Sequence, residues 1–454
     1  MRIAFWLLQD SIRQWAGWVA GLHYVRNCLE GLASLPNDSV PEVVAFVPTS
    51  LREKLLAGAA FSDSSWFRIH LIEDELLLDL SRRDELARRV NDEHCDLLFP
   101  AITPPAVPFD GKCVGWITDL QHKHYPEFFS AAELRHRDEL FSFLSATCDR
   151  IVCSSAAVQT DMLRFFPEVE DRTFILRFRT HPPASAISGT PDSVMHELQI
   201  DEPYVYLPYQ FWQHKNHRVV FEAWARLHQE SKAPLLVCSG ARVDGRNPEH
   251  FPSLEQLIES NRLADRIRIL GMVPREQQWQ LYRNSTFVIQ PSLFEGWSTS
   301  VEEARSLGKT VLLSDIPVHR EQTTSPDDIF EPHDADRLAD LIKVRFQDAP
   351  TGYSPESERH AIEASTERLQ DFGRDLVRLF ESTMQCDRKP MSASVLPLLL
   401  SAQNEAAKRL EVIEHLKSQV ESLNSAQLNS QPGHQASPPP RRRWFRRRQI
   451  RADQ

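Results

Sequence analysis

The sequence lacks any apolar run near the ~20 residues that a helix needs to cross a bilayer. Its start, residues 1–15, has a few apolar residues and then Asp10, which predicts a first strand rather than a signal peptide. The seven cysteines are scattered and show neither a paired framework nor metal-ligand spacing. These absences exclude a membrane-spanning protein and a disulfide scaffold. They predict a cytoplasmic protein with reduced thiols and no bound metal.

The composition is that of a globular protein with an uneven distribution of charge. Of the 454 residues, 41% are hydrophobic and 25% charged, and this length predicts two or three domains. The net charge is −11, but residues 441–454 hold seven arginines and one aspartate, a side-chain charge of +6. Residues 1–440 therefore carry −17, so an acidic body precedes a basic tail.

The stretch 286–322 contains a strand, a helix and a second strand within a few residues of each other. Residues 286–290 are an apolar, β-branched run, and residues 310–313 repeat the pattern. Between them, residues 299–307 have apolar positions at helical spacing, and Gly308 is placed to end the helix. Such βαβ units belong to parallel sheets covered by helices.

The loop before that helix is the first candidate site. It lies at the carboxyl end of a strand and the amino end of a helix, where open α/β sheets bind ligands and where free N–H groups suit a phosphate. Gly296 would let an anion approach the backbone closely. The candidate residues of this loop are Glu295, Gly296, Trp297, Ser298 and Thr299. Glu303 lies one turn into the helix and can face the same crevice as the loop.

Glu295 and Glu303, with seven residues between them, resemble the E-x7-E motif of the retaining glycosyltransferases of family 4, which have the GT-B fold. The resemblance implies that Glu303 holds the nucleotide ribose, that Glu295 lies near the donor sugar and that loop amides hold the diphosphate. A capping box formed by Thr299 with Glu302, or by Ser300 with Glu303, is the competing interpretation. For Glu302 we predict a capping or solvated role.

A second loop, residues 208–217, follows the strand at 204–207 and resembles the family's "HKNH" variant. The resemblance implies that Lys215 lies over the diphosphate, where an ammonium would stabilise the charge that grows as the sugar leaves. The family often adds an arginine a few residues earlier. Here Gln210 occupies that neighbourhood. A solvated loop lysine is the alternative for Lys215.

The polar and aromatic segment 118–129 follows another strand and resembles the "HD…hPEyF" stretch of family 4 members. The resemblance implies that Asp119 faces the acceptor side. Thr118 stands where many relatives have a histidine, and His122 is the candidate substitute. For His124 we predict a structural role in the loop.

Two weaker groups of candidates come from the same resemblance. Gly17 and Gly21 fall in the loop after the first strand, which in the family is Gly-rich and lies beside donor and acceptor, and they are equally well explained as turn glycines. The backbone at Met272 and Val273 would meet the edge of the nucleobase.

The resemblance covers residues 1–385 and implies two Rossmann-like domains that face each other across a cleft, followed by a helical and disordered C-terminal tail. The predicted parts are an N-terminal acceptor domain at 1–181, a linker at 182–198, a C-terminal nucleotide-sugar domain at 199–365, a helix crossing back to the N-terminal domain at 366–384, a helical or coiled-coil segment at 385–430 and a disordered basic tail at 431–454.

The tail differs in kind from the body. Residues 404–424 keep heptad spacing, which predicts a homodimer seam or a helix that lies on the body. The basic and aromatic run Arg441–Arg448 fits an anionic membrane surface better than a nucleic acid, because the body is acidic and the implied acceptor is membrane-borne. A solubilising tail is the alternative, and no nucleic-acid partner is expected.

The sequence thus predicts a retaining glycosyltransferase, cytoplasmic or peripheral on the inner face of a membrane. It would move a sugar from a nucleotide-diphosphate sugar to a glycan or lipid-linked acceptor, with bacterial surface polysaccharide as the implied product and without a cofactor. Two alternatives remain open at this point: a sugar-nucleotide epimerase on the same fold, and an inactive GT-B scaffold. The base, the sugar and the acceptor are not encoded in a recognisable pattern.

Overall fold

The computed structural model describes residues 1–8, 19–103, 107–230, 233–348 and 352–387. The predictions for Gly17, for the heptad segment 404–424 and for the basic run Arg441–Arg448 lie outside these residues and stay predictions.

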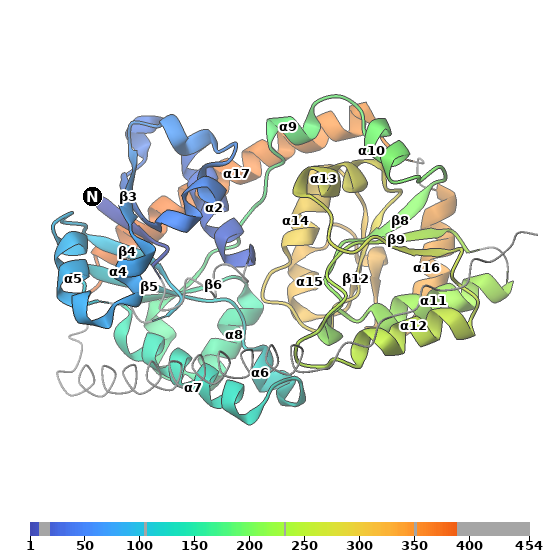
Figure 1. Ribbon diagram of the computed structural model, residues 1–454, viewed down its shortest axis with the longest axis horizontal. Coiled ribbons are helices and arrows are strands. Elements are labelled where there is room, and N and C mark those ends of the chain that lie inside the picture. The colour runs from blue at the N-terminus through green and yellow to red at the C-terminus, as the bar shows by residue number, and fades with distance from the viewer. Residues whose placement is uncertain (9–18, 104–106, 231–232, 349–351, 388–454) are drawn as a thin grey trace, which may run out of the picture. The chain divides into compact units, whose positions relative to one another are not determined.

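The first sheet has seven parallel strands in the order β3-β2-β1-β4-β5-β6-β7 (Figure 1). The chain order reverses between β1 and β4, which is the switch point of a doubly wound sheet. The strands are β1 Arg2–Trp6, β2 Glu42–Pro48, β3 Phe67–Ile72, β4 Leu97–Ala101, β5 Lys112–Ile117, β6 Arg150–Cys153 and β7 Thr173–Ile175. The helices among them are α2 Val19–Ala33, α3 Arg52–Leu56, α4 Asp74–Leu78, α5 Arg83–Asn91, α6 Gln121–His124, α7 Ala131–Thr147 and α8 Ala156–Phe165. We call these elements the first lobe.

The second sheet has six parallel strands in the order β10-β9-β8-β11-β12-β13, and its order reverses between β8 and β11. The strands are β8 Tyr204–Leu207, β9 Leu235–Cys238, β10 Ile267–Ile269, β11 Val288–Gln290, β12 Val311–Ser314 and β13 Ile329–Phe330. The helices are α9 Ala184–Ile187, α10 Asp192–Glu197, α11 His217–Glu230, α12 His250–Ser260, α13 Arg275–Asn284, α14 Thr299–Ser306, α15 Pro317–Gln322 and α16 Ala335–Asp348. We call these elements the second lobe; α9 and α10 lie within the predicted linker.

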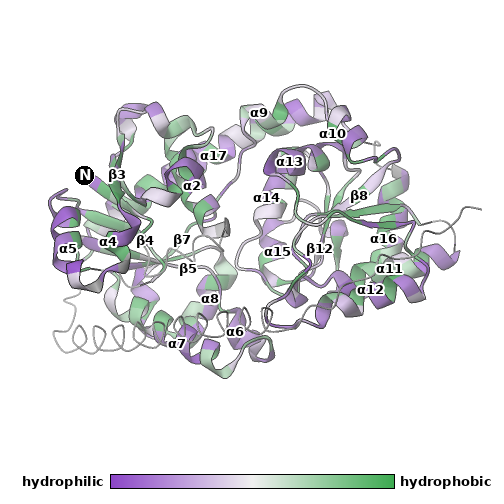
Figure 2. Ribbon diagram, viewed as in Figure 1, coloured by the Kyte–Doolittle hydropathy of each residue, from purple (hydrophilic) through white to green (hydrophobic). Residues whose placement is uncertain are grey.

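Alternate residues of each central strand enter opposite cores, because successive side chains of a strand point to opposite faces. Ile3 and Phe5 of β1 enter the core beneath α2, while Ala4 and Trp6 enter the core that α5, α7 and α8 cover. In the second lobe, the cores lie under α11, α12 and α16 on one face and under α10, α13 and α14 on the other. Figure 2 shows strands that are mostly hydrophobic between helices of mixed polarity. Both sheets are thus buried on two faces, as the prediction of parallel sheets requires.

The last described helix, α17 (Pro355–Met384), belongs to both lobes. It begins at Pro355 rather than at residue 366, and its later residues, among them Phe372 and Leu376, complete the core beneath α2. Helix α17 packs closely on α2, because a Cβ added to Gly373 would lie 2.2 Å from the carbonyl oxygen of Gly31. A glycine at this crossing therefore lets the backbones approach.

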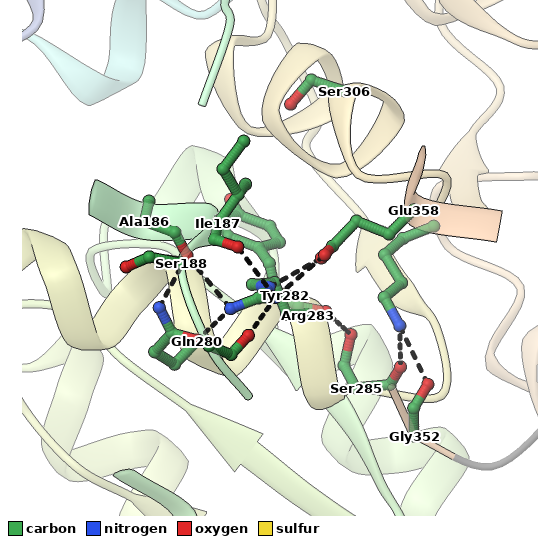
Figure 3. Close-up of polar contacts among 12 residues, drawn as sticks. Ala186, Ile187, Ser188, Gln280, Tyr282, Arg283, Ser285, Ser306, Gly352 and Glu358 are labelled. Carbon is green, nitrogen blue, oxygen red and sulfur yellow. Dashed lines mark hydrogen bonds and ion pairs between the residues drawn. The ribbon is translucent and has the colours of Figure 1, made fainter. Parts of the chain in front are cut away.

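The two chain segments that pass between the lobes are both tied to Arg283 of α13 (Figure 3). The Arg283 guanidinium is fully buried and donates to the backbone oxygens of Ala186 and Gly189, which precede α10. It also forms an ion pair with Glu358 in the first turn of α17, with 2.6 Å between Nε and Oε1. The crossing helix and the linker thus share one anchor in the second lobe.

Candidate active site

Two loops leave the carboxyl ends of β8 and β11, the neighbouring strands at which the order of the second sheet reverses. The loop after β8 carries Lys215, and the loop after β11 carries Glu295. Lys215 Nζ lies 2.6 Å from Glu295 Oε1. Open α/β sheets bind their ligands at this switch point. The structure therefore joins the two main candidate residues of the sequence where a ligand is expected.

The Glu295 carboxylate is fixed by more than the lysine. Its Oε1 also accepts hydrogen bonds from Ser292 Oγ at 2.6 Å and from Gln290 Nε2 at 2.9 Å. Burial raises the pKa of Glu295, but the Lys215 ammonium, the neighbouring His214 and the hydrogen bonds from Lys215 and Ser292 together outweigh burial, and the net pKa lies below its ordinary value. The sequence analysis missed Gln290 and Ser292. A polar residue at the end of an otherwise apolar strand, as Gln290 is, was the available signal.

Glu303 projects from the first turns of α14 and forms an ion pair with Arg275, the first residue of α13. The Glu303 side chain is only 5% exposed. Burial raises the pKa of the Tyr209 phenol well above its ordinary value, and the negative charges of Glu295 and Glu303 raise it further. The charges of both glutamates therefore act on one side chain, that of Tyr209.

The charges of Arg275 and Glu303 act on a histidine of the first lobe, His23. Burial and the neighbouring Arg275 charge lower the pKa of His23, on α2, to about 4, while Glu303 acts in the opposite direction. His23 is thus a neutral side chain near the Arg275–Glu303 pair, and no sequence motif pointed to it. Gly21, a weaker candidate, lies in the same helix two residues earlier.

Gly296 has a different surrounding from the one predicted. A Cβ added to Gly296 would lie 1.9 Å from the carbonyl oxygen of Thr118, in the loop after β5. The space that we assigned to an approaching anion is therefore occupied by the backbone of the first lobe. Glycine is required at position 296 because the two loops touch there.

We expect Gly296→Ala to force the two loops apart and to lower the free energy of unfolding by ~1–3 kcal/mol, since an added methyl group overpacks a filled site. Urea unfolding monitored by circular dichroism measures the change. Gly245→Ala is the matched control, because nothing lies within 4 Å of a Cβ added there. Equal unfolding midpoints for the two variants would show that the Thr118 contact is not maintained in solution.

The next two loop residues are used within the protein. Trp297 is buried and its Nε1 donates to the carbonyl oxygen of Phe178 at 3.0 Å. The Ser298 N–H donates to Gln322 Oε1 at 3.2 Å, so this amide already has a partner. The backbone amides of Trp297 and of Thr299, which begins α14, stay candidates for the diphosphate.

Glu302 corrects the sequence prediction of a capping or solvated role. Its side chain is 2% exposed and forms an ion pair with Arg179 at 3.0 Å. It also accepts a hydrogen bond from Gln322 Nε2 at 3.2 Å. Helix α14 places Glu302 toward the segment after β7, so the residue joins the two lobes and caps nothing.

The acceptor-side prediction for His122 is wrong in its geometry. The His122 side chain is 1% exposed, and its Nε2 lies 2.9 Å from Asp138 Oδ1. Burial lowers the pKa of His122 although Asp138 opposes that change. Its imidazole is therefore not presented to a ligand and does not substitute for a histidine at Thr118.

The neighbouring residues of this segment differ in accessibility. Asp119 is partly buried; its Oδ1 accepts from the Gln121 N–H at 3.0 Å and lies 3.8 Å from an Arg137 nitrogen. His124 pairs with Asp161 at 2.8 Å, in agreement with the structural role predicted for it. Asp119 thus remains the acceptor-side candidate of the segment.

Met272 and Val273 follow β10, at the same edge of the second sheet as the Lys215 and Glu295 loops. Met272 is 68% exposed, which is unusual for a large apolar side chain in this protein. β10 lies two strands from β8, so these residues border the site from the side.

Two features are absent from the described residues. No group of three or more His, Cys, Asp or Glu side chains there could hold a metal ion. Within the same residues, no helix combines the length and the apolar character needed to cross a membrane.

Comparison with known proteins places this geometry in a family context. Residues 194–368 match the sequence model of the family described as "Glycosyl transferases group 1". The O-antigen chain mannosyltransferase B of Escherichia coli is 30% identical over 135 residues, which are 30% of this chain and 34% of that protein. The GPI3 subunit of the phosphatidylinositol N-acetylglucosaminyltransferase of Saccharomyces cerevisiae (strain YJM789) is 26% identical over 214 residues, 42% and 43% of the two chains. The chain therefore spans less than half the length of these curated relatives.

Solved structures extend the likeness to the whole fold. The crystal structure of Anabaena Alr3699/HepE in complex with UDP-glucose superposes with a TM-score of 0.59, at 16% identity, over 84% of this chain and 100% of that one. Our prediction of the GT-B fold is confirmed; membership of family 4 in particular stays a proposal. The chain therefore has the fold of these structures, and its residues 194–368 are similar to the group 1 glycosyltransferases.

Proposed function

We propose that this chain is a retaining glycosyltransferase of family 4. It transfers a hexose from a nucleotide-diphosphate sugar to a glycan or lipid-linked acceptor. In this reaction the bond between the anomeric carbon and the diphosphate oxygen breaks, the oxygen of an acceptor hydroxyl bonds to that carbon, and the hydroxyl proton passes to the departing diphosphate. The single observation that carries the proposal is the Lys215–Glu295 contact at the β8/β11 switch point.

Each residue has a role that fits its position. Lys215 and the amide of Thr299 offset the charge of the leaving diphosphate, without a metal cofactor. Glu303, held by Arg275 and nearly buried, accepts hydrogen bonds from the ribose hydroxyls. Glu295, fixed by three donors, faces the transferred sugar. Asp119 lies on the acceptor side.

The comparisons support the substrate classes only by analogy. One structural neighbour was crystallised with UDP-glucose, and one relative is named as an O-antigen chain mannosyltransferase. We propose a nucleotide sugar as donor and a bacterial surface polysaccharide or its lipid-linked precursor as acceptor. For the C-terminal segments we propose a dimer seam at residues 404–424 and a contact with the inner face of a membrane at Arg441–Arg448.

Incubation of the full chain with UDP-glucose and with GDP-mannose, followed by chromatography of the products, tests the proposal. We expect slow release of a nucleotide diphosphate. Glu303→Gln should reduce it about 10–100-fold, because a hydrogen bond to a charged group contributes ~1.5–3 kcal/mol. Glu230→Gln is the control, since Glu230 is exposed and pairs with Lys343 of α16 rather than with a candidate site residue.

The competing assignments give different products. Isomerisation of the sugar without release of nucleotide would favour a sugar-nucleotide epimerase. An absence of binding to either nucleotide sugar in calorimetry would contradict the proposal and favour a scaffold.

A further inference from the structure

A cavity of about 140 Å³ lies beside the proposed donor site, and the roles assigned so far leave it unused. Its walls come from the turn after α6 in the first lobe and from the loops after β8 and β9 in the second. The lining residues are Glu127, Phe128, Gln213, His214, Asp244, Arg246 and Asn247.

The walls offer the groups that a polyhydroxylated ligand requires. Asn247 Nδ2 donates to Gln213 Oε1 at 2.9 Å, and within the described residues no further hydrogen bond engages Gln213 Nε2 or Asn247 Oδ1. One amide donor and one amide acceptor thus remain for a ligand, beside the Arg246 guanidinium and the exposed Glu127 carboxylate. Hydroxyl groups, which both donate and accept, match such a mixture better than an acyl chain does.

The cavity is held open by a rigid frame. Asp244 is 7% exposed, and its two oxygens accept hydrogen bonds from the Gln213 N–H at 2.9 Å and from the Arg246 N–H at 3.0 Å. On the other wall, Phe128 stacks on Tyr125 with 5.1 Å between ring centroids and 8° between planes. The polar groups are therefore oriented before any ligand arrives, which reduces the entropic cost of binding.

An exposed aromatic side chain lies against one of the lining residues: the ring centroid of Trp212 is 5.6 Å from that of His214. Trp212 directly precedes the lining residue Gln213 and is 37% exposed, whereas most large apolar side chains here are buried. The negative face of an indole attracts the weakly positive C–H groups on the face of a sugar ring. A solvent-exposed tryptophan beside amides and carboxylates is thus a surface suited to a saccharide.

The cavity and the donor site share one loop. His214 lines the cavity, and its carbonyl oxygen accepts a hydrogen bond from the Leu293 N–H at 2.8 Å, two residues before Glu295. The next residue, Lys215, forms the ion pair with Glu295. The cavity wall and the Lys215–Glu295 pair are therefore formed by neighbouring residues of the same loop.

We propose that this cavity binds the terminal sugar of a saccharide acceptor, with Trp212 stacked on its ring and Gln213, Asn247 and Glu127 on its hydroxyl groups. This inference rests on the proposed function for its purpose, because an acceptor exists only if the chain transfers a sugar. Binding of the saccharide itself does not depend on the donor, so the two proposals fail separately.

Saturation-transfer NMR on the full chain tests the inference, with methyl α- and β-glycosides of glucose, galactose, mannose and N-acetylglucosamine as probes. At least one glycoside is expected to bind the unmodified protein. Its signal should fall at least five-fold in Trp212→Ala and in Glu127→Ala, which alter opposite lobes. Val243→Ala, an exposed apolar residue of the loop after β9 that does not line the cavity, is the control and should keep the signal.

Two results would overturn the inference: no binding of any glycoside to the unmodified protein, or a signal that persists in both Trp212→Ala and Glu127→Ala. If Trp212→Ala distorts its loop, thermal unfolding reveals it and Glu127→Ala decides, since Glu127 lies on an exposed turn of the other lobe. Nucleotide-sugar binding is measured on the same samples. A protein that binds glycosides through Trp212 but no nucleotide sugar would reject the proposed function and keep the cavity assignment.

Discussion

Lys215→Met is expected to lower kcat/KM for the nucleotide sugar by two to three orders of magnitude, the largest effect of any single substitution in the site. The ammonium is the cation that the structure places at the β8/β11 switch point, where the diphosphate would leave. Removing one preorganised group that stabilises developing charge costs about 10²–10³ in rate. Steady-state assays of nucleotide release with UDP-glucose and GDP-mannose measure the effect.

A purely structural role for Lys215 would also lower activity, so stability has to be measured in parallel. Lys215→Met leaves the Glu295 carboxylate, which is 11% exposed, without its cation, and a buried unpaired charge is destabilising. In the double variant Lys215→Met/Glu295→Gln the charge is gone, and Ser292 can still donate to the amide oxygen. We expect this double variant to regain stability and to remain inactive.

The opposite pattern would contradict the assignment. If Lys215→Met/Glu295→Gln recovered nucleotide release together with stability, the pair would serve folding alone. Lys343→Met/Glu230→Gln is the matched control, because it neutralises an ion pair between α16 and α11, away from the switch point. It should change neither nucleotide release nor its dependence on donor concentration.

The fold could be predicted from the sequence because its determinants are local. Short β-branched runs, such as 286–290 and 310–313, alternate with amphipathic segments, and this order allows few architectures besides two parallel sheets. The loops that follow β8 and β11 were then the predicted place for a ligand site. Lys215 and Glu295 were both identified there, and the structure brings their side chains into contact.

The partners of the site residues could not be predicted in the same way. Arg275 meets Glu303 because α13 and α14 lie side by side, and nothing in the spacing of the two residues states which faces of these helices meet. The capping box proposed for Glu302 is a local pattern, and it was outweighed by Arg179, a residue of the segment after β7. Contacts between distant elements thus decided the cases in which local patterns failed.

The loop at 118–129 shows a second limit. His122 was the candidate there because it lies in a polar loop after a strand, near Thr118, but burial cannot be derived from loop composition. The His122 imidazole pairs with Asp138 of α7, and its ring centroid lies 5.4 Å from that of Phe141. The resemblance to a motif therefore does not state which side chains of the segment are buried.

Arg283→Met is expected to lower the free energy of unfolding by ~3–5 kcal/mol, the cost of leaving one partner of a buried ion pair without the other. Glu358, whose side chain is 9% exposed, would lose its cation. The carbonyl oxygen of Gly189 would lose its donor at the same time, and that of Ala186 would keep only the hydrogen bond from Gln280 Nε2. These groups hold the linker and the start of α17 (Figure 3). The rate of backbone amide hydrogen exchange should therefore rise in residues 184–189 and 355–360 at denaturant concentrations that leave the two sheets protected.

The loss of stability in Arg283→Met depends on the burial of the ion pair. Helix α17, which carries Glu358, also carries an exposed ion pair for comparison. Arg374 forms an ion pair with Asp371 on α17 at 2.6 Å, but both side chains are more than half exposed. Exposed pairs contribute little, so Arg374→Met should leave the urea midpoint and the exchange pattern as they are. Glu358→Leu in the Arg283→Met background removes the stranded carboxylate and should restore part of the lost stability. If Arg283→Met and Arg374→Met unfolded at the same midpoint, Arg283 would not anchor the two crossing segments, and their attachment would have to come from the apolar core beneath α2.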